Sequence, residues 1–190
     1  MPDLLPEWIA FVGLLGVVVA ASVTDIRTEK IPNRLTYPAA LGALSYWLLA
    51  GLLAGRGIGG QDGTLAASFI ALLAGLIPFF ILITIGGLGG GDMKLMAAIG
   101  AIAGRWEVVL ATTVYALLIG ALIAIVLMVK HKRVKLTLYR IVGIASTRGK
   151  AIKPDDLPGG PKVPFALAAA AGAAIGGAEH MLELWTPLLW

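Results

Sequence analysis

Long apolar runs separated by short polar stretches make up most of this chain. The runs cover residues 4–24, 35–54, 64–85, 95–104 and 108–129, and a sixth extends from about residue 163 toward the C-terminus. A membrane-spanning helix needs about 20 mainly apolar residues, and every run except the fourth has that length. The fourth is too short for an upright span unless residues 92–94 join it. The pattern predicts an all-α, polytopic integral membrane protein with about six transmembrane helices.

The composition agrees with this pattern and excludes several classes of protein. Of the 190 residues, 58% are hydrophobic and only 14% are charged, which leaves no room for a large domain outside the membrane. We therefore expect residues 1–190 to form one membrane-embedded domain, and nucleic acid is not an expected partner. The absence of cysteine excludes disulfides, cysteine-bound metals and thiol nucleophiles. His131 and His180 fall on opposite predicted sides of the membrane, so we expect no metal and no cofactor.

Lysine and arginine are divided unequally between the two ends of the predicted helices. Arg56 and Arg105 fall on one side, and the remaining thirteen of the 15 basic residues fall on the other. Because the cytoplasmic loops of membrane proteins are enriched in Lys and Arg, we expect the basic side to be cytoplasmic and both termini to lie outside. The first run lacks the positive n-region of a secretory signal peptide, so we interpret it as a permanent helix.

One long polar segment, about residues 130–162, carries nine of these basic residues. Within it, apolar residues recur at helical spacing beside lysines and arginines; they are Val134, Leu138, Ile141, Val142 and Ala145. Such an amphipathic helix is typical of segments that lie on anionic lipid headgroups. We favour this interpretation over a role in docking a substrate.

Two carboxylates stand out on the predicted cytoplasmic side. Asp25 directly follows the first apolar run, and Asp92 lies between a glycine run and the fourth apolar run. The two should therefore lie at a similar depth, where the first and fourth helices are able to bring them together. The other carboxylates on that side have simpler explanations, because Asp155 and Asp156 follow a proline in a polar loop and Glu29 stands between basic residues.

A pair of neighbouring carboxylates has a specific chemistry. Two such groups cannot both ionise easily, so they share a proton, and one acts as base while the other acts as acid. The pair is then able to activate a water molecule against an amide carbonyl and to protonate the leaving nitrogen. For Asp25 taken alone, a polar helix end is an equally good interpretation. Asp92 is the stronger candidate, because of the glycines that precede it.

The residues around these carboxylates indicate supporting roles. Gly89 and Gly91 permit backbone geometry and a close approach that a Cβ would prevent. Lys94 lies two positions after the second carboxylate, so on a helix it should point elsewhere, and we expect it to reach the membrane interface. Pro32 and Asn33 form a helix-start signal for the second span, and Asn33 is also able to hydrogen-bond an aspartate.

Together these segments resemble a known family. Residues 24–36 (TDIRTEKIPNRLT) and residues 89–100 (GGGDMKLMAAIG) resemble the two catalytic segments of the type IV prepilin peptidases, which are aspartic proteases of the GxGD class. Residues 161–172 (PKVPFALAAAAG) are similar to the final-helix segment of the short members that serve tight-adherence (Flp) pili. The resemblance implies that Asp25 and Asp92 are the catalytic pair.

The resemblance also implies a substrate and a location. Family members remove the short basic leader of prepilins or pseudopilins, which continue into an apolar helix, at the cytoplasmic face of the bacterial inner membrane. Larger members also methylate the new N-terminus and carry a zinc-binding cysteine set; this chain has no cysteine, so we expect no N-methylation. The expected partners are a prepilin-like substrate and a bilayer with anionic headgroups, and the sequence leaves a homo-oligomer open.

Three other functions are open on the sequence alone. Two aspartates at the membrane edge are compatible with a proton or cation transporter, although transporters commonly carry such groups at mid-membrane within repeated halves. Archaeal members of similar size process preflagellins. In a noncatalytic scaffold, the glycines would serve helix packing and the aspartates would only end helices.

Overall fold

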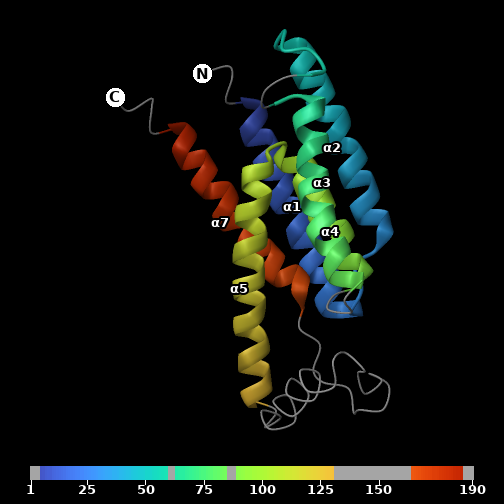
Figure 1. Ribbon diagram of the computed structural model, residues 1–190, viewed down its shortest axis with the longest axis vertical. Coiled ribbons are helices and arrows are strands. Elements are labelled where there is room, and N and C mark those ends of the chain that lie inside the picture. Colours follow the sequence, from blue (N-terminus) through green and yellow to red (C-terminus); the bar gives the residue numbers. More distant parts are fainter. Residues whose placement is uncertain (1–4, 60–62, 85–88, 131–163, 186–190) are drawn as a thin grey trace. The chain divides into compact units, whose positions relative to one another are not determined.

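The computed structural model describes residues 5–59, 63–84, 89–130 and 164–185, and its regular secondary structure in those ranges is α-helix (Figure 1). The helices are α1 (Leu5–Thr28), α2 (Asn33–Leu53), α3 (Leu65–Thr84), α4 (Gly90–Ala103), α5 (Trp106–Lys130) and α7 (Phe165–Trp185). The chain forms two compact units, of which the first is Met1–Ile119 with Pro164–Trp190 and the second is Gly120–Val163. The described part of the second unit is the end of α5. The amphipathic helix expected in the loop of residues 130–162 lies outside the described residues.

Five helices have the length and the hydropathy of membrane spans, namely α1, α2, α3, α5 and α7. This confirms the prediction of an all-α, polytopic membrane protein. The fourth helix differs, because α4 has only 14 residues and, at 1.5 Å per residue, is about 21 Å long. Residues 92–94 do enter α4, yet the helix stays shorter than the hydrocarbon core of a bilayer.

Helix α4 lies inside the first unit rather than on its surface (Figure 1). It contacts α1, α2, α3 and α7, and every residue from Leu95 to Ile102 is buried. A helix that its neighbours cover in this way does not have to match the thickness of the lipid. The short length of α4 is therefore compatible with a membrane protein.

Helices α3 and α4 approach each other closely because each has a glycine where they meet. A Cβ on Gly75 would overlap the backbone of Met96, and a Cβ on Gly100 would overlap the backbone of Ala71. Small residues at such positions let the backbones of membrane helices come together and increase their van der Waals contact. The two glycines thus hold α4 against α3.

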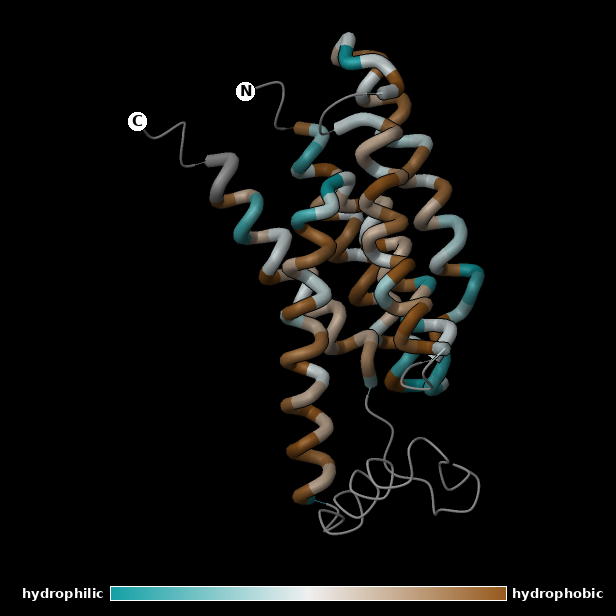
Figure 2. Tube along the Cα trace, viewed as in Figure 1, coloured by the Kyte–Doolittle hydropathy of each residue, from teal (hydrophilic) through white to brown (hydrophobic). Residues whose placement is uncertain are grey.

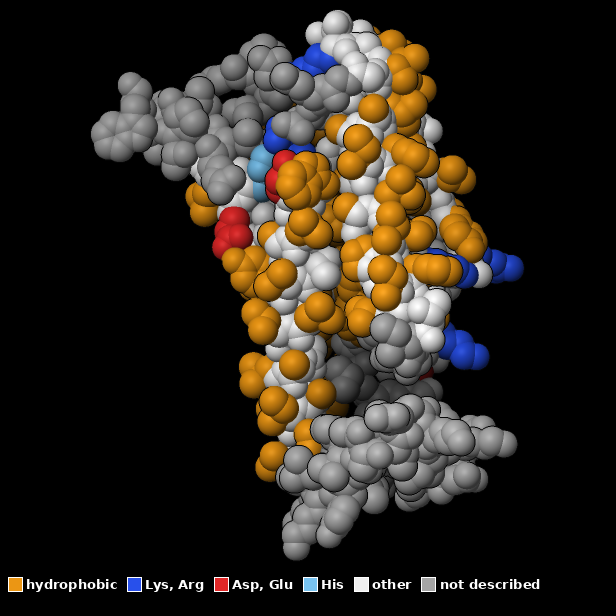
Figure 3. Space-filling view, in the orientation of Figure 1, with side chains coloured by type: hydrophobic (Ala, Val, Ile, Leu, Met, Phe, Trp, Pro, Cys, Tyr) orange, Lys and Arg blue, Asp and Glu red, His pale blue; other side chains and the backbone are white. Residues whose placement is uncertain are grey.

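The outer surface of the spans is strongly apolar, as a surface in contact with lipid must be. Figure 2 shows hydrophobic residues along the lengths of α1, α2 and α3, with the most hydrophilic residues near helix ends. Hydrophobic side chains also dominate the described part of the face seen in Figure 3. Trp8 and Trp106, close to helix ends, are 45% and 49% exposed, which is the placement expected of interfacial anchors.

Candidate active site

Asp25 lies in the last turn of α1. The sequence pattern placed the end of this helix at residue 24, but α1 continues to Thr28, so that Asp25 is within the helix rather than after it. The helix ends at Glu29, whose φ of 53° is left-handed and whose amide donates to the Asp25 carbonyl oxygen at 2.8 Å. A left-handed residue with this hydrogen bond is a common helix stop. The turn leads the chain to Pro32, which is the N-cap residue of α2, so α2 begins where the helix-start signal predicted.

Asp92 lies in the first turn of α4 and closes the start of that helix. Gly89 is the N-cap residue, and its amide donates to Asp92 Oδ2 at 3.2 Å. The Asp92 amide donates in turn to the Gly89 carbonyl oxygen at 3.1 Å. An acidic side chain in this position interacts favourably with the first amides of the helix and with the positive end of its dipole. These bonds hold the Asp92 carboxyl group at the start of α4.

A close backbone approach brings the two carboxylate-bearing segments together. A Cβ on Gly91 would lie 3.3 Å from Ile31 Cβ and 3.7 Å from the Ile31 backbone nitrogen, and Ile31 is buried. Its neighbour Gly90 differs, because no atom lies within 4 Å of a Cβ built there. The absence of a side chain at Gly91 therefore lets the segment after α1 pack directly on the start of α4.

Asp25 and Asp92 interact electrostatically at this junction. Burial raises the pKa of Asp92, the hydrogen bond from the Gly89 amide lowers it, and the charge of Asp25 raises it again, with the result that the pKa of Asp92 is about 6. Asp92 lies outside the five candidate spans. A carboxyl group with this pKa exchanges its proton close to neutral pH, which is what general acid–base catalysis needs. The two aspartates that the sequence placed on one side are thus near enough for the charge of Asp25 to act on Asp92.

A further segment, which sequence reasoning did not assign to the site, contacts Asp25. The first turn of α7 lies against α1, and the Ala166 amide donates to Asp25 Oδ2 at 3.2 Å. This amide is among the first N–H groups of a helix, which have no partner within the helix itself, so the carboxylate satisfies it. Pro164, just before the helix, and the apolar run that follows it mark this helix start in the sequence. Neither signal indicates that the turn would reach Asp25.

Lys94 lies on α4 beside the start of α2. Its Nζ donates to Asn33 Oδ1 at 2.9 Å and lies 5.2 Å from the centre of the Tyr37 ring, which is within cation–π range. Asn33 therefore binds the ammonium group of Lys94 rather than an aspartate. The contact ties α2 to α4 close to the junction of the two carboxylate-bearing segments.

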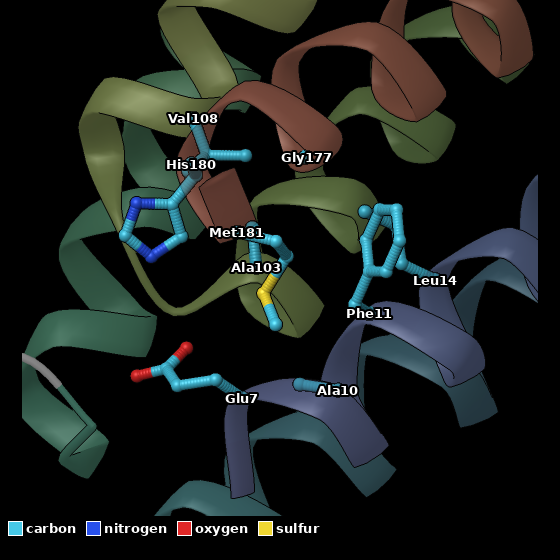
Figure 4. Close-up of a pocket in the computed structure, with 9 residues that line it drawn as sticks. All are labelled: Glu7, Ala10, Phe11, Leu14, Ala103, Val108, Gly177, His180 and Met181. Atoms are coloured by element: carbon cyan, nitrogen blue, oxygen red, sulfur yellow. The ribbon is translucent and has the colours of Figure 1, made fainter. Parts of the chain in front are cut away.

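Figure 4 shows a small pocket. It lies at the ends of α1 and α4 that are remote from the two carboxylates. It is lined by Glu7, Ala10, Phe11, Leu14, Ala103, Val108, Gly177, His180 and Met181. Glu7 is near the start of α1 and Ala103 ends α4, whereas Asp25 and Asp92 are at the other ends, so this pocket is separate from the carboxylate pair. Arg105 Nη2 lies 3.8 Å from Glu7 Oε1. Within the described part of the chain, no group of three His, Cys, Asp or Glu residues is placed to hold a metal ion.

Comparisons with known proteins find relatives of this chain. It is 31% identical over 136 residues to a prepilin leader peptidase/N-methyltransferase of Aeromonas hydrophila, which covers 70% of this chain and 46% of the relative. A protein of the same name from Bacillus subtilis is 38% identical over 128 residues, covering 63% of this chain and 43% of the relative. The chain thus spans less than half the length of these relatives. No solved structure matches it.

The profile of a protein family also matches. The Type IV leader peptidase family matches residues 12–125, a range that holds α2, α3, α4 and most of α1 and α5. Both Asp25 and Asp92, together with the glycines before Asp92, lie inside the matched range. The chain therefore belongs to the type IV leader peptidase family.

Proposed function

We propose that this chain is a membrane aspartyl endopeptidase that removes the short basic leader of a prepilin-like protein, with Asp25 and Asp92 as the catalytic pair. The observation that carries the proposal is the packing of Gly91 on Ile31, which brings the two carboxylate-bearing helix ends to one junction, where the charge of Asp25 acts on Asp92. Membership of a leader peptidase family indicates the type of reaction, and the two carboxyl groups are able to supply the base and the acid that it needs.

The two carboxyl groups begin the reaction in different states. Asp92, whose pKa is raised, holds the proton that is given to the substrate, and Asp25, which accepts the Ala166 amide, acts as the base. Asp25 takes a proton from a water molecule as the water oxygen attacks the scissile carbonyl carbon, and Asp92 gives its proton to the carbonyl oxygen. Asp25 then passes its proton to the leaving nitrogen, the C–N bond breaks, and Asp92 recovers a proton from a hydroxyl group of the intermediate. Each carboxyl group thereby returns to its starting state.

The substrate in this proposal is a prepilin or pseudopilin with a basic leader and an apolar helix. The matched relatives carry prepilin leader peptidase in their names, which supports this class. Large apolar side chains are exposed along α1, α2 and α3, and this surface is compatible with an apolar substrate helix beside them in the membrane. The scissile bond would then lie at the helix end that holds the carboxylate pair.

We assign that end to the cytoplasmic face of the inner membrane. Arg27 and Lys94 lie at the same helix ends as the carboxylate pair, whereas Arg56 and Arg105 follow the opposite ends of α2 and α4. The positive-inside rule places the more basic side in the cytoplasm. Anionic lipid headgroups at that face are the further partner that we expect.

We propose that the chain performs peptide cleavage without N-methylation, although the matched relatives are also named as N-methyltransferases. The support is the lack of any cysteine in its 190 residues. The resemblance to the type IV prepilin peptidases implies that the members which methylate carry a zinc-binding set of cysteines. Mass spectrometry of the processed substrate tests this directly, since a methyl group on the new N-terminus would contradict it.

The test of the proposed function is cleavage of a purified prepilin by the full chain in detergent or in liposomes with anionic lipid. We expect Asp25→Asn and Asp92→Asn each to lower the cleavage rate by at least about 1,000-fold, because each removes one half of the proton relay. Glu29→Gln, which alters a carboxylate four positions from Asp25, is the matched control and should stay within about threefold of wild type.

Two results would contradict the proposal. Cleavage at the wild-type rate by either Asn variant would show that the pair is not catalytic. Proton uptake into liposomes that both Asn variants lose, with no cleavage by the wild type, would support a transporter instead. Each variant is first checked for membrane insertion and for a single folded peak in size-exclusion chromatography.

A further inference from the structure

Helix α1 holds both polar groups of the Ala166 backbone. The Ala166 amide donates to Asp25 Oδ2 at 3.2 Å, and its carbonyl oxygen accepts from Ser22 Oγ at 3.0 Å. Ser22 and Asp25 are three positions apart, so they lie on the same face of α1. Ser22 is 6% exposed and Ala166 is 0% exposed, so water competes little for these bonds. A single residue of α7 thus bridges the catalytic aspartate and a serine one turn before it.

The first turn of α7 is restrained on two sides. The Ser22 hydroxyl has a single proton, which it shares between the Ala166 carbonyl oxygen and the Val18 carbonyl oxygen of its own helix, 2.7 Å from Ser22 Oγ. The second contact keeps the serine side chain in place on α1. On the other side, the Phe165 ring packs edge-to-face on Phe79 of α3, with ring centres 5.5 Å apart, and both rings are buried. The turn that carries the Ala166 amide is therefore clamped between α1 and α3.

We propose that Ser22 is a positioning residue for the cleavage reaction, which holds the Ala166 carbonyl oxygen and thereby keeps the Ala166 amide on the Asp25 carboxylate. This inference rests on the proposed function, since it takes Asp25 as the base. Without the hydroxyl group, one of the two polar contacts between α1 and the first turn of α7 is lost. The turn is then held less firmly on α1, although Phe165 still packs on Phe79, and the amide shifts relative to the carboxylate.

The amide matters because its hydrogen bond fixes the direction of the Asp25 carboxylate, and the base must point at the water molecule that it activates. Without the amide, the carboxylate is free to turn about its side-chain bonds and is held less often in the reactive direction. The loss should therefore appear in kcat rather than in KM.

The test compares Ser22→Ala with Ser68→Ala in the full chain. Ser68 is a matched control, because its buried hydroxyl group also donates across helices to a backbone carbonyl, that of Ala101 at 2.7 Å, but near the end of α4 that is remote from Asp92. We expect Ser22→Ala to lower kcat about tenfold with KM unchanged. Ser68→Ala should leave kcat within about twofold of wild type.

Two further variants complete the test. Ser22→Thr keeps a hydroxyl group on the same carbon and should restore the wild-type kcat. Phe165→Leu loosens the same turn from the α3 side and should lower kcat with KM unchanged, as Ser22→Ala does, which keeps the inference testable if the serine variant folds poorly. Thermal unfolding in the same detergent shows whether each variant is folded at the assay temperature.

The failures of the two proposals are distinguishable. If Ser22→Ala and Phe165→Leu keep the wild-type kcat, as Ser68→Ala does, while Asp25→Asn and Asp92→Asn are inactive, the positioning role is overturned and the proposed function stands. If Asp25→Asn still cleaves the substrate, the proposed function itself fails.

Discussion

Gly91 lies against Ile31 so closely that one added methyl group would press the two segments of the candidate site apart, because a Cβ on Gly91 would lie 3.3 Å from Ile31 Cβ. We expect Gly91→Ala to cost about 1 kcal/mol of stability. The cleavage rate should fall about tenfold, since a small displacement of the carboxylates misaligns the reacting groups. Thermal unfolding and prepilin cleavage in the same detergent measure both effects.

Gly90→Ala is the control for this prediction. Gly90 is adjacent in sequence, yet no atom lies within 4 Å of a Cβ built there. Because alanine favours a helix more than glycine does, stability should be unchanged or raised by up to about 1 kcal/mol, and the cleavage rate should not change. Equal losses in the two variants would show that the approach of Gly91 to Ile31 is not what the site depends on.

The hydrogen bond between Lys94 and Asn33 should contribute modestly to the packing of α2 on α4. A double-mutant cycle with Lys94→Met, Asn33→Ala and the double variant measures it as a coupling energy in the free energy of unfolding. We expect about 0.5 to 1 kcal/mol, because the bond is charge-assisted but partly exposed. A cycle with Lys30→Met in place of Lys94→Met is the control and should show no coupling energy. If the effects of Lys94→Met and Asn33→Ala on the free energy of unfolding were strictly additive, the bond would not contribute to the packing.

The raised pKa of Asp92 predicts that Asp92→Asn stabilises the protein at neutral pH. The pKa is about 6, against an ordinary value of 3.8, so the folded state binds this proton more tightly than the unfolded state. Below about pH 4 the carboxyl group is protonated in both states, so its ionisation does not change the free energy of unfolding. Between about pH 4 and pH 6 the unfolded state loses the proton first, and the free energy of unfolding falls. Above about pH 6 the carboxyl group is charged in both states, and the folded protein is destabilised by the full cost of burying that charge.

Thermal unfolding of wild type and Asp92→Asn between pH 4 and pH 8 measures this effect. The two proteins should have the same stability near pH 4. Above about pH 6.5 the variant should be more stable by on the order of 1 kcal/mol, a figure that allows for solvent screening of a carboxyl group that is only partly buried. If the variant were more stable than wild type by the same amount at pH 4 and at pH 8, the gain in stability would not come from the protonation of Asp92.

Substitutions at Gly75 and Gly100 should disrupt the packing of α3 on α4. Because a Cβ at either position would overlap the backbone of the facing helix, the helices must move apart, and we expect a loss of about 3 kcal/mol or more for each alanine variant. Gly42→Ala on α2 is the control, since a Cβ there meets nothing within 4 Å. The folded fraction after detergent extraction should fall for the first two variants alone.

The apolar runs alone determined most of the fold at the level of elements. Lipid offers the backbone no hydrogen bonds, so a long apolar run has to form a helix, and hydropathy with length was enough to predict the five spans. The same pattern located Asp25 and Asp92 at helix ends on one side. Two helix ends differed. Helix α4 begins at Gly90 rather than at residue 95, and α1 ends one turn later than expected, because the left-handed turn that stops it is at Glu29, which carries no strong sequence signal.

Only the tertiary structure decided which segments meet at those ends. Three contacts depend on how the helices cross. Helix α4 is covered on several sides, Ile31 packs on Gly91, and Asn33 binds Lys94. The contact of Ala166 with Ser22 and Asp25 is the clearest case. It is made by the backbone of an alanine, and a backbone amide is the same in every residue except proline, so no pattern in the sequence marks the one that reaches Asp25.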